Sequence, residues 1–249
     1  MAQSEVSIGR KLLAEFVGST FLVIAAISPT ILAYNVLHAE SMLAVLSDSL
    51  AVAFMLFALI EVLGPVSGCH INPAVTLSMF ITKKIDIKTG IEYVAVQISG
   101  GILGTICSHL MFYNINPILL TISTVERPGG CYFAEFLGTF LLLTTIYGCT
   151  NNNSRLMSLV VSLLVGGMLL TTSSTMFANP QVTIARIFTY AIAGIEPYDA
   201  AFFVFVEILG SLAATGFSLY LFPVSSMTEN SRMRSIVVDN AKMKRESSE

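Results

Sequence analysis

Six apolar segments occupy most of this chain, and each is about as long as a helix that crosses a lipid bilayer. They lie near residues 12–34, 46–64, 90–112, 132–148, 156–173 and 200–222. An α-helix of about 18 to 20 apolar residues covers the ~30 Å hydrocarbon core. Charged residues make up 12% of the chain, against roughly a quarter in soluble domains. The sequence therefore predicts an all-α integral membrane protein with six transmembrane helices.

Positive charge is distributed unequally between the two sides of the predicted membrane. Of the 13 Lys and Arg residues, all except Arg127 and Arg186 fall on one side when the chain is threaded through six spans. Cytoplasmic loops hold the excess of Lys and Arg, so both termini are expected in the cytoplasm. The first segment is too long for the core of a cleavable signal peptide. We expect it to stay in a plasma or inner membrane.

Short motifs occur twice, in the same order. Ala14-Glu15-Phe16 opens the first segment and Ala134-Glu135-Phe136 opens the fourth, while Asn72-Pro73 follows the second and Asn179-Pro180 the fifth. Each half then holds three spans, an odd number, so the second half is inserted upside down relative to the first. Inverted repeats of this kind place the solute path near the membrane midplane.

The repeat also predicts the domain organisation. Residues 12–222 form one channel domain, with repeat one at 12–112 and repeat two at 131–222, preceded by a cytoplasmic segment at 1–11. Residues 223–249 are polar and lack apolar periodicity, which is typical of a flexible tail.

The apolar stretches after the two Asn-Pro pairs, 73–81 and 180–187, are too short to cross the membrane. Pro suits the first turn of a helix and Asn suits the cap before it. We therefore expect two re-entrant half-helices whose N-termini meet at the centre. Each N-terminus carries about half a positive charge, which repels cations. The amides of Asn72 and Asn179 can donate to a permeating oxygen and interrupt a proton relay.

The two Asn-Pro loops resemble the signature loops of the aquaporins, the major intrinsic proteins. The first loop reads Gly64-Pro65-Val66-Ser67-Gly68-Cys69-His70-Ile71-Asn72-Pro73-Ala74-Val75-Thr76. The second contains Phe177-Ala178-Asn179-Pro180-Gln181-Val182 and resembles that of a bacterial subgroup found beside arsenic-resistance genes. The resemblance covers roughly residues 10 to 222.

Several properties follow from the resemblance as expectations. It implies an inverted 3+3 fold, passive conduction of water and small neutral solutes without catalysis or a cofactor, and a homotetramer in the lipid bilayer. It places Asn72, Pro73, Ala74, Asn179, Pro180 and Gln181 in the pore signature. It gives Glu15, Glu135 and His70 a role in supporting the re-entrant loops, whose unwound backbone needs hydrogen-bond partners at membrane depth.

The outer constriction departs from the pattern of this family. Water channels carry an Arg three residues after the second signature Asn, and here that residue is Val182. The other constriction residues correspond to Val52, Gly167 and Met176. None of the four is aromatic or charged, so we predict a wide apolar pore that also admits glycerol or urea. Undissociated arsenous acid is added as a solute only because of the resemblance to the subgroup found beside arsenic-resistance genes.

Two residues near this constriction, Arg186 and Gln181, leave more than one interpretation, and a third, Cys69, gives a testable expectation. Arg186, one helical turn beyond Val182 towards the outer mouth, is either a displaced cationic element or a surface side chain. Gln181 replaces a small Ala and either adds an amide to the pore or wedges the half-helices apart. Cys69 is expected beside the pore, where mercurials would block it and Cys69→Ser would abolish the block.

Two other functions are compatible with the sequence. Glu61 and Glu207 lie within predicted spans, as carboxylates do in proton-coupled solute carriers. Glu61 either lines the cytoplasmic vestibule or packs against a neighbouring helix. Gln181 and the absence of the usual Arg also suit a non-conducting structural membrane protein. The net charge of −3 gives no indication of nucleic acid as a partner, and the four cysteines lack metal-ligand spacing.

Overall fold

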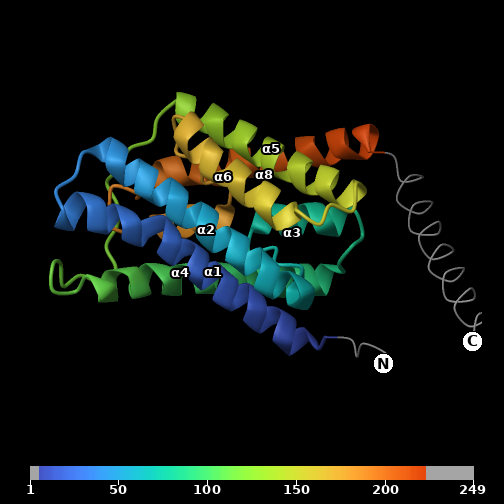
Figure 1. Ribbon diagram of the computed structural model, residues 1–249, viewed down its shortest axis with the longest axis horizontal. Coiled ribbons are helices and arrows are strands. Elements are labelled where there is room, and N and C mark those ends of the chain that lie inside the picture. The colour runs from blue at the N-terminus through green and yellow to red at the C-terminus, as the bar shows by residue number, and fades with distance from the viewer. Residues whose placement is uncertain (1–5, 223–249) are drawn as a thin grey trace, which may run out of the picture.

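The computed structural model describes residues 6–222, and the regular secondary structure within this range is helical. The predicted tail at 223–249 lies outside the described residues, as do residues 1–5 of the N-terminal segment. The elements are α1 (Ile8–Thr30), η1 (Ile31–Val36), α2 (Ser41–Ser67), α3 (Pro73–Ile81), α4 (Ile87–Met111), α5 (Gly130–Asn151), α6 (Met157–Thr171), α7 (Pro180–Arg186) and α8 (Pro197–Leu221). Figure 1 shows the long helices running side by side as one bundle.

Five helices of the described chain are long and apolar enough to cross a membrane. The first of them continues from α1 into η1, a π-helical segment that begins two residues after Pro29. The remaining predicted span, 156–173, is realised as α6 and has only 15 residues, or about 22 Å at 1.5 Å per residue. Its shortness follows from the polar residues at its end, since Thr172 is already extended.

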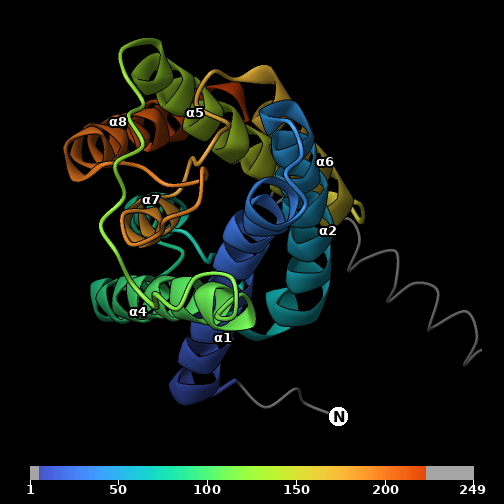
Figure 2. The same cartoon turned by 90° about the vertical axis from the view of Figure 1, so that its left-hand side faces the viewer.

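The two short helices lie inside the bundle. Figure 2 looks along the bundle and shows α7 between α8 and α4. Each short helix begins with Pro, and the preceding Asn caps it: Asn72 Oδ1 accepts from Ala74 N at 2.8 Å, and Asn179 Oδ1 accepts from Gln181 N at 3.2 Å. Because the N–H of a first-turn Pro is not needed, this Asn-Pro sequence starts a helix abruptly.

The two caps also join the half-helices to each other. Asn72 Nδ2 donates to the carbonyl of Ala178 at 2.8 Å, and Asn179 Nδ2 donates to the carbonyl of Ile71 at 2.9 Å. The two N-termini therefore meet, as the repeat predicts. With six membrane-length or near-length helices around two opposed half-helices, the predicted fold class is confirmed.

Glycines allow the long helices to pack in symmetric pairs. A Cβ on Gly100 of α4 would lie 2.5 Å from the carbonyl oxygen of Phe16 in α1. In the second half, a Cβ on Gly210 of α8 would lie 2.6 Å from the carbonyl oxygen of Phe136 in α5. Such close backbone approach is typical of membrane helix pairs. The first residues of α1 and the last residues of α8 lie at the same end of the bundle (Figure 1).

Candidate pore

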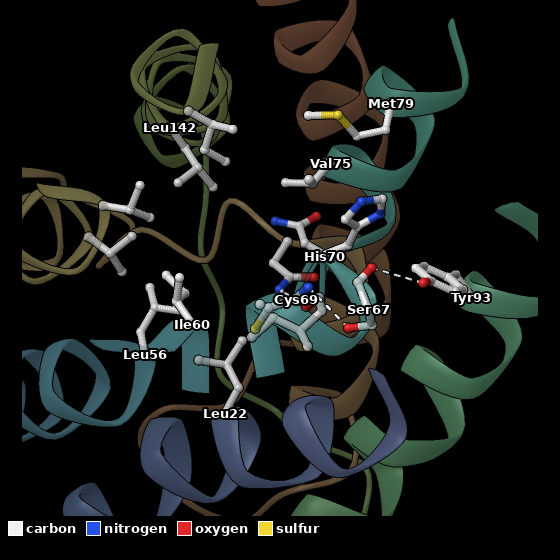
Figure 3. Close-up of a pocket in the computed structure, with 18 of the residues that line it drawn as sticks. Leu22, Leu56, Ile60, Ser67, Cys69, His70, Val75, Met79, Tyr93 and Leu142 are labelled. Atoms are coloured by element: carbon white, nitrogen blue, oxygen red, sulfur yellow. Dashed lines mark hydrogen bonds between the residues drawn. The ribbon is translucent and has the colours of Figure 1, made fainter. Parts of the chain in front are cut away.

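A cavity of about 670 Å³ runs through the bundle between the two halves. At one end, called here the α3 end, its lining includes Lys11, Lys84 and Thr89; at the other, the α7 end, it includes Ala26 and Arg186. Much of its wall is aliphatic and consists of Leu22, Val52, Leu56, Ile60, Leu142, Val161, Val165, Leu169 and Val182. In Figure 3 several of these side chains point from the long helices towards the loop that carries Cys69 and His70.

The opposite wall is formed by the two re-entrant loops. Asn72 and Asn179 both line the cavity, with Cys69, Ile71, Met176 and Ala178 close to them in the chain. One N–H of each Asn amide is used in the bond to the other loop. Since a primary amide has two N–H groups, each Asn retains a second donor.

One buried carboxylate, that of Glu15, holds the first loop. Glu15 is fully buried and accepts from the backbone N–H of His70 at 2.9 Å and of Ile71 at 2.6 Å. It also accepts from Ser67 Oγ and from Gln97 Nε2, the latter at 2.8 Å. Cys69 and Ile71 have positive φ angles, which L-residues rarely adopt. The four donors to Glu15 therefore stabilise an otherwise unfavourable backbone at membrane depth.

The second loop is held in a related way. Glu135 accepts from Phe177 N at 2.9 Å and from Ala178 N at 2.6 Å. Glu207 accepts from Asn179 N at 3.1 Å and from Thr183 Oγ1 at 2.7 Å. Both carboxyl groups are fully buried, and neither residue lines the cavity.

His70 lies at the edge of the first loop. Its Nδ1 is 3.2 Å from Thr76 Oγ1, and its ring packs edge-on against Tyr93. Tyr93 in turn donates to the carbonyl of Ser67 at 2.9 Å (Figure 3). His70 thus contacts the loop it belongs to and also lines the cavity.

The four residues assigned to the constriction do not contribute equally. Val52, Met176 and Val182 line the cavity and are otherwise buried. Gly167 does not line it, and a Cβ there would meet nothing within 4 Å. Phe177, which the sequence did not single out, also lines the cavity.

Arg186 is not a surface side chain, so that interpretation of the sequence is wrong. Only 2% of it is exposed, and it lines the cavity at the α7 end. Its Nη2 donates to the carbonyl of Ala26 at 2.6 Å and to Asp48 Oδ2 at 3.1 Å. Its guanidinium lies 4.2 Å from the centre of the Phe177 ring. Burial is possible because a carboxylate, a carbonyl and an aromatic face replace water.

Arg127 and Asp48 are further polar residues that sequence reasoning missed at this end. Arg127 donates to the carbonyls of Ser174 and Gly194, each at 2.8 Å, and its guanidinium lies 4.7 Å from the Phe177 ring centre. Asp48 is an acid inside the apolar segment 46–64. An ionisable residue inside a span needs a partner, and this rule was the signal that could have revealed the ion pair.

Gln181 is a buried residue that does not line the cavity. Its Oε1 lies against Gly101 of α4, where a Cβ would overlap it, and its Nε2 is 3.4 Å from the carbonyl of Ile71. The side chain therefore neither adds an amide to the pore wall nor separates the half-helices, which stay bonded through Asn72 and Asn179.

The two carboxylates that suggested a proton-coupled carrier lie away from the cavity. Glu61 is exposed, does not line the cavity and accepts from Ser158 of α6, so it packs against a neighbouring helix. Glu207 lies behind the second loop. Within residues 6–222 no group of three His, Cys, Asp or Glu side chains is placed to hold a metal ion.

Comparison with known proteins agrees with this geometry. The family model described as "Major intrinsic protein" matches residues 2–178. Aquaglyceroporin AqpS of Rhizobium meliloti is 33% identical over 217 residues, which cover 87% of this chain and 92% of the relative. Aquaporin AqpM of Methanothermobacter thermautotrophicus is 31% identical over 193 residues, covering 67% of this chain and 76% of the relative.

A solved structure shares the fold. The aquaglyceroporin from Plasmodium falciparum superimposes with a TM-score of 0.61 at 20% identity, covering 88% of this chain and 97% of that chain. The family model, the relatives and the opposed half-helices lead to one assignment. The chain belongs to the major intrinsic protein family, whose members are membrane channels and not enzymes.

Proposed function

We propose that this channel passively conducts water together with small uncharged solutes such as glycerol, urea and undissociated arsenous acid. The proposal rests mainly on the three constriction residues that line the cavity, Val52, Met176 and Val182. Their side chains are neither charged nor aromatic, so they leave a wide apolar path. An aliphatic wall opposite loop amides suits solutes that have both carbon and hydroxyl groups.

Ion exclusion would come from the centre of the channel. Two helix N-termini point at each other beside Asn72 and Asn179, and their partial positive charges oppose cations. The free N–H of each amide donates to the oxygen of a passing water. That water then donates to both its neighbours, so a proton cannot be relayed through it.

Uncoupled diffusion is supported by the positions of the carboxylates. A proton-coupled carrier would place Glu61 or Glu207 beside the solute, but neither lines the cavity. A purely structural role is opposed by the size of the cavity, about 670 Å³. We further propose a multi-pass protein of the plasma or inner membrane with cytoplasmic termini, so that the α7 end is the outer end, and a homotetrameric assembly.

The proposal is tested by light scattering from proteoliposomes that contain the purified protein. Osmotic shocks with glycerol, urea and arsenous acid should each give swelling well above that of protein-free vesicles. The rate should rise linearly with solute concentration and should not respond to a pH gradient. Saturable flux that follows the gradient would instead identify a carrier, and flux equal to empty vesicles would identify a structural protein.

The position of the constriction is tested by Val182→Arg. A guanidinium at this position would narrow the apolar path, so glycerol and urea permeability should fall by roughly tenfold while water still passes. A second arginine variant such as Val160→Arg is not a suitable control for the added charge, because Val160 is on an exposed face of α6 and not in the cavity wall. Val182→Leu, which adds bulk without charge, is the matched variant and should reduce glycerol flux less. Unchanged glycerol flux in Val182→Arg would show that the constriction lies elsewhere.

A further inference from the structure

The α7 end of the cavity combines an aliphatic wall with one ion pair. Arg186, from the last turn of α7, pairs with Asp48 of α2 at 3.1 Å, and the two residues are 138 positions apart in the chain. The side chains are 2% and 4% exposed. Arg186 lines the cavity, whereas Asp48 lies behind it.

Two polar atoms of this pair have no hydrogen-bond partner among the described residues. They are Arg186 Nε, a donor, and Asp48 Oδ1, an acceptor. A buried donor without a partner is costly, and such a group in a native protein usually has a functional role or binds a water molecule or ion. Arg186 belongs to the cavity wall, and its Nη1 takes no part in the bonds that Nη2 makes to Ala26 and Asp48, so the guanidinium keeps a donor for an oxygen atom of a solute that enters.

The charges around Arg186 balance. Asp48 offsets the charge of Arg186 directly. Arg127 lies near the same Phe177 ring, and the carboxylate of Asp199 accepts from the Arg127 backbone N–H at 2.5 Å and from the Tyr132 hydroxyl. These two guanidinium groups and two carboxylates cancel formally, so Arg186 offers a strong donor whose positive charge is offset at close range.

We propose that Arg186 is the solute-selecting residue at the α7 end, and that Asp48 is the positioning residue that neutralises it. The Arg186 guanidinium donates through Nη1 to the hydroxyl oxygen of neutral solutes, polyols or undissociated oxyacids, as they leave water. Asp48 fixes the guanidinium and cancels its charge, so the conjugate anions of such acids gain no binding site. This inference rests on the proposed channel function.

The test uses full-length protein in proteoliposomes and four forms: wild type, Arg186→Gln, Asp48→Asn, and the double variant Arg186→Gln/Asp48→Asn. The measured quantities are the permeabilities to glycerol and to water, each with sodium formate or with sodium gluconate present. Lys88→Gln is the matched control, because Lys88 is a highly exposed cation in a surface pair with Glu92. Size-exclusion profiles identify the variants that remain folded.

Each variant has a distinct expected result. Arg186→Gln should lower the ratio of glycerol to water permeability by about tenfold, the factor that corresponds to one lost hydrogen bond to a charged group. Asp48→Asn leaves Arg186 charged and unpaired, so formate but not gluconate should inhibit glycerol flux at least severalfold. The double variant keeps a neutral hydrogen bond between the two side chains. It should fold normally, keep the low glycerol-to-water ratio and lose the inhibition by formate.

Three results would overturn the inference. If the double variant recovers the wild-type glycerol-to-water ratio, the pair only ties α7 to α2. If folded Arg186→Gln has an unchanged ratio, Arg186 does not select solutes. If formate leaves Asp48→Asn unaffected, charge neutralisation by Asp48 is wrong. Wild type without solute flux would overturn the proposed channel function itself, which distinguishes that failure from failure of the inference.

Discussion

The two halves of the channel hold their re-entrant loops with the same geometry but with different chemistry. In the first half Gln97 donates through Nε2 to Glu15 at 2.8 Å and to Thr76 Oγ1 at 3.0 Å. In the second half the corresponding residue is Glu207, which accepts from Thr183 Oγ1 and interacts with the carboxyl group of Glu135. A carboxyl and an amide in one half are therefore replaced by two carboxyl groups in the other.

This difference shows which of the two loop-supporting residues the fold requires and which it allows to vary. Both halves need a carboxylate that accepts two consecutive backbone N–H groups of the loop, at His70 and Ile71 or at Phe177 and Ala178. The residue beside that carboxylate can vary. Glu15 accepts four hydrogen bonds, whereas Glu135 accepts the two backbone bonds from Phe177 and Ala178. The first half thus depends more heavily on its carboxylate.

The largest expected effect comes from removing these carboxylates. Glu15→Ala removes the acceptor of four donors, two of them fully buried. A buried donor left unsatisfied costs roughly 1–3 kcal/mol, so the variant should fail to fold or have a much lower thermal midpoint. Glu135→Ala removes the acceptor of two donors, so its effect should be about half as large. Thermal midpoints from size exclusion in detergent measure both. Equal losses would show that the two carboxylates support their loops to the same degree.

A smaller effect is expected from copying the second half into the first. Gln97→Glu removes the donor to Glu15 and to Thr76 and places two carboxyl groups together. We expect a loss of about 3 kcal/mol in the free energy of unfolding. Gln97→Met, which removes the donor without adding a carboxyl group, is the control and should cost less. If the two variants are equally stable, repulsion between carboxyl groups contributes nothing.

The sequence predicts this architecture well because the architecture depends on local sequence patterns. Segment length, the doubled Ala-Glu-Phe and the doubled Asn-Pro are enough to place six spans and two opposed half-helices, and the structure confirms that fold class. The length of α6 was overestimated, because hydrophobicity alone does not locate where Thr172 leaves the helix.

The remaining features depend on how helices are rotated against each other. The pair of Asp48 and Arg186 joins residues from different halves, and no local period relates them. The Phe177 ring between two guanidinium groups and the contact of Gln181 with Gly101 have the same origin. Without coordinates, Gln181 could be placed in the pore as easily as against α4.

A third comparison between the halves concerns the residue that follows each Asn-Pro pair. Ala74 lies opposite Ser211, whose hydroxyl donates to the Ala74 carbonyl at 2.8 Å, while Gln181 lies opposite Gly101. Gly101→Ala would place a Cβ against Gln181 Oε1, and overpacking of this kind costs about 1–3 kcal/mol. The double variant Gly101→Ala/Gln181→Ala should recover most of the lost thermal stability. A double variant no more stable than Gly101→Ala would mean that another contact causes the loss.

The smallest expected effect makes the second half resemble the first. In Glu207→Gln the new Oε1 can still accept from Asn179 N and Thr183 Oγ1, while the new Nε2 can donate to Glu135 as Gln97 donates to Glu15. One added hydrogen bond to a carboxylate should stabilise the protein by about 1–2 kcal/mol, seen as a higher thermal midpoint. Because Glu207 does not line the cavity, water permeability should not change. A lower midpoint would mean that the second half requires the carboxyl group, and that the difference between the halves is a requirement and not a tolerated substitution.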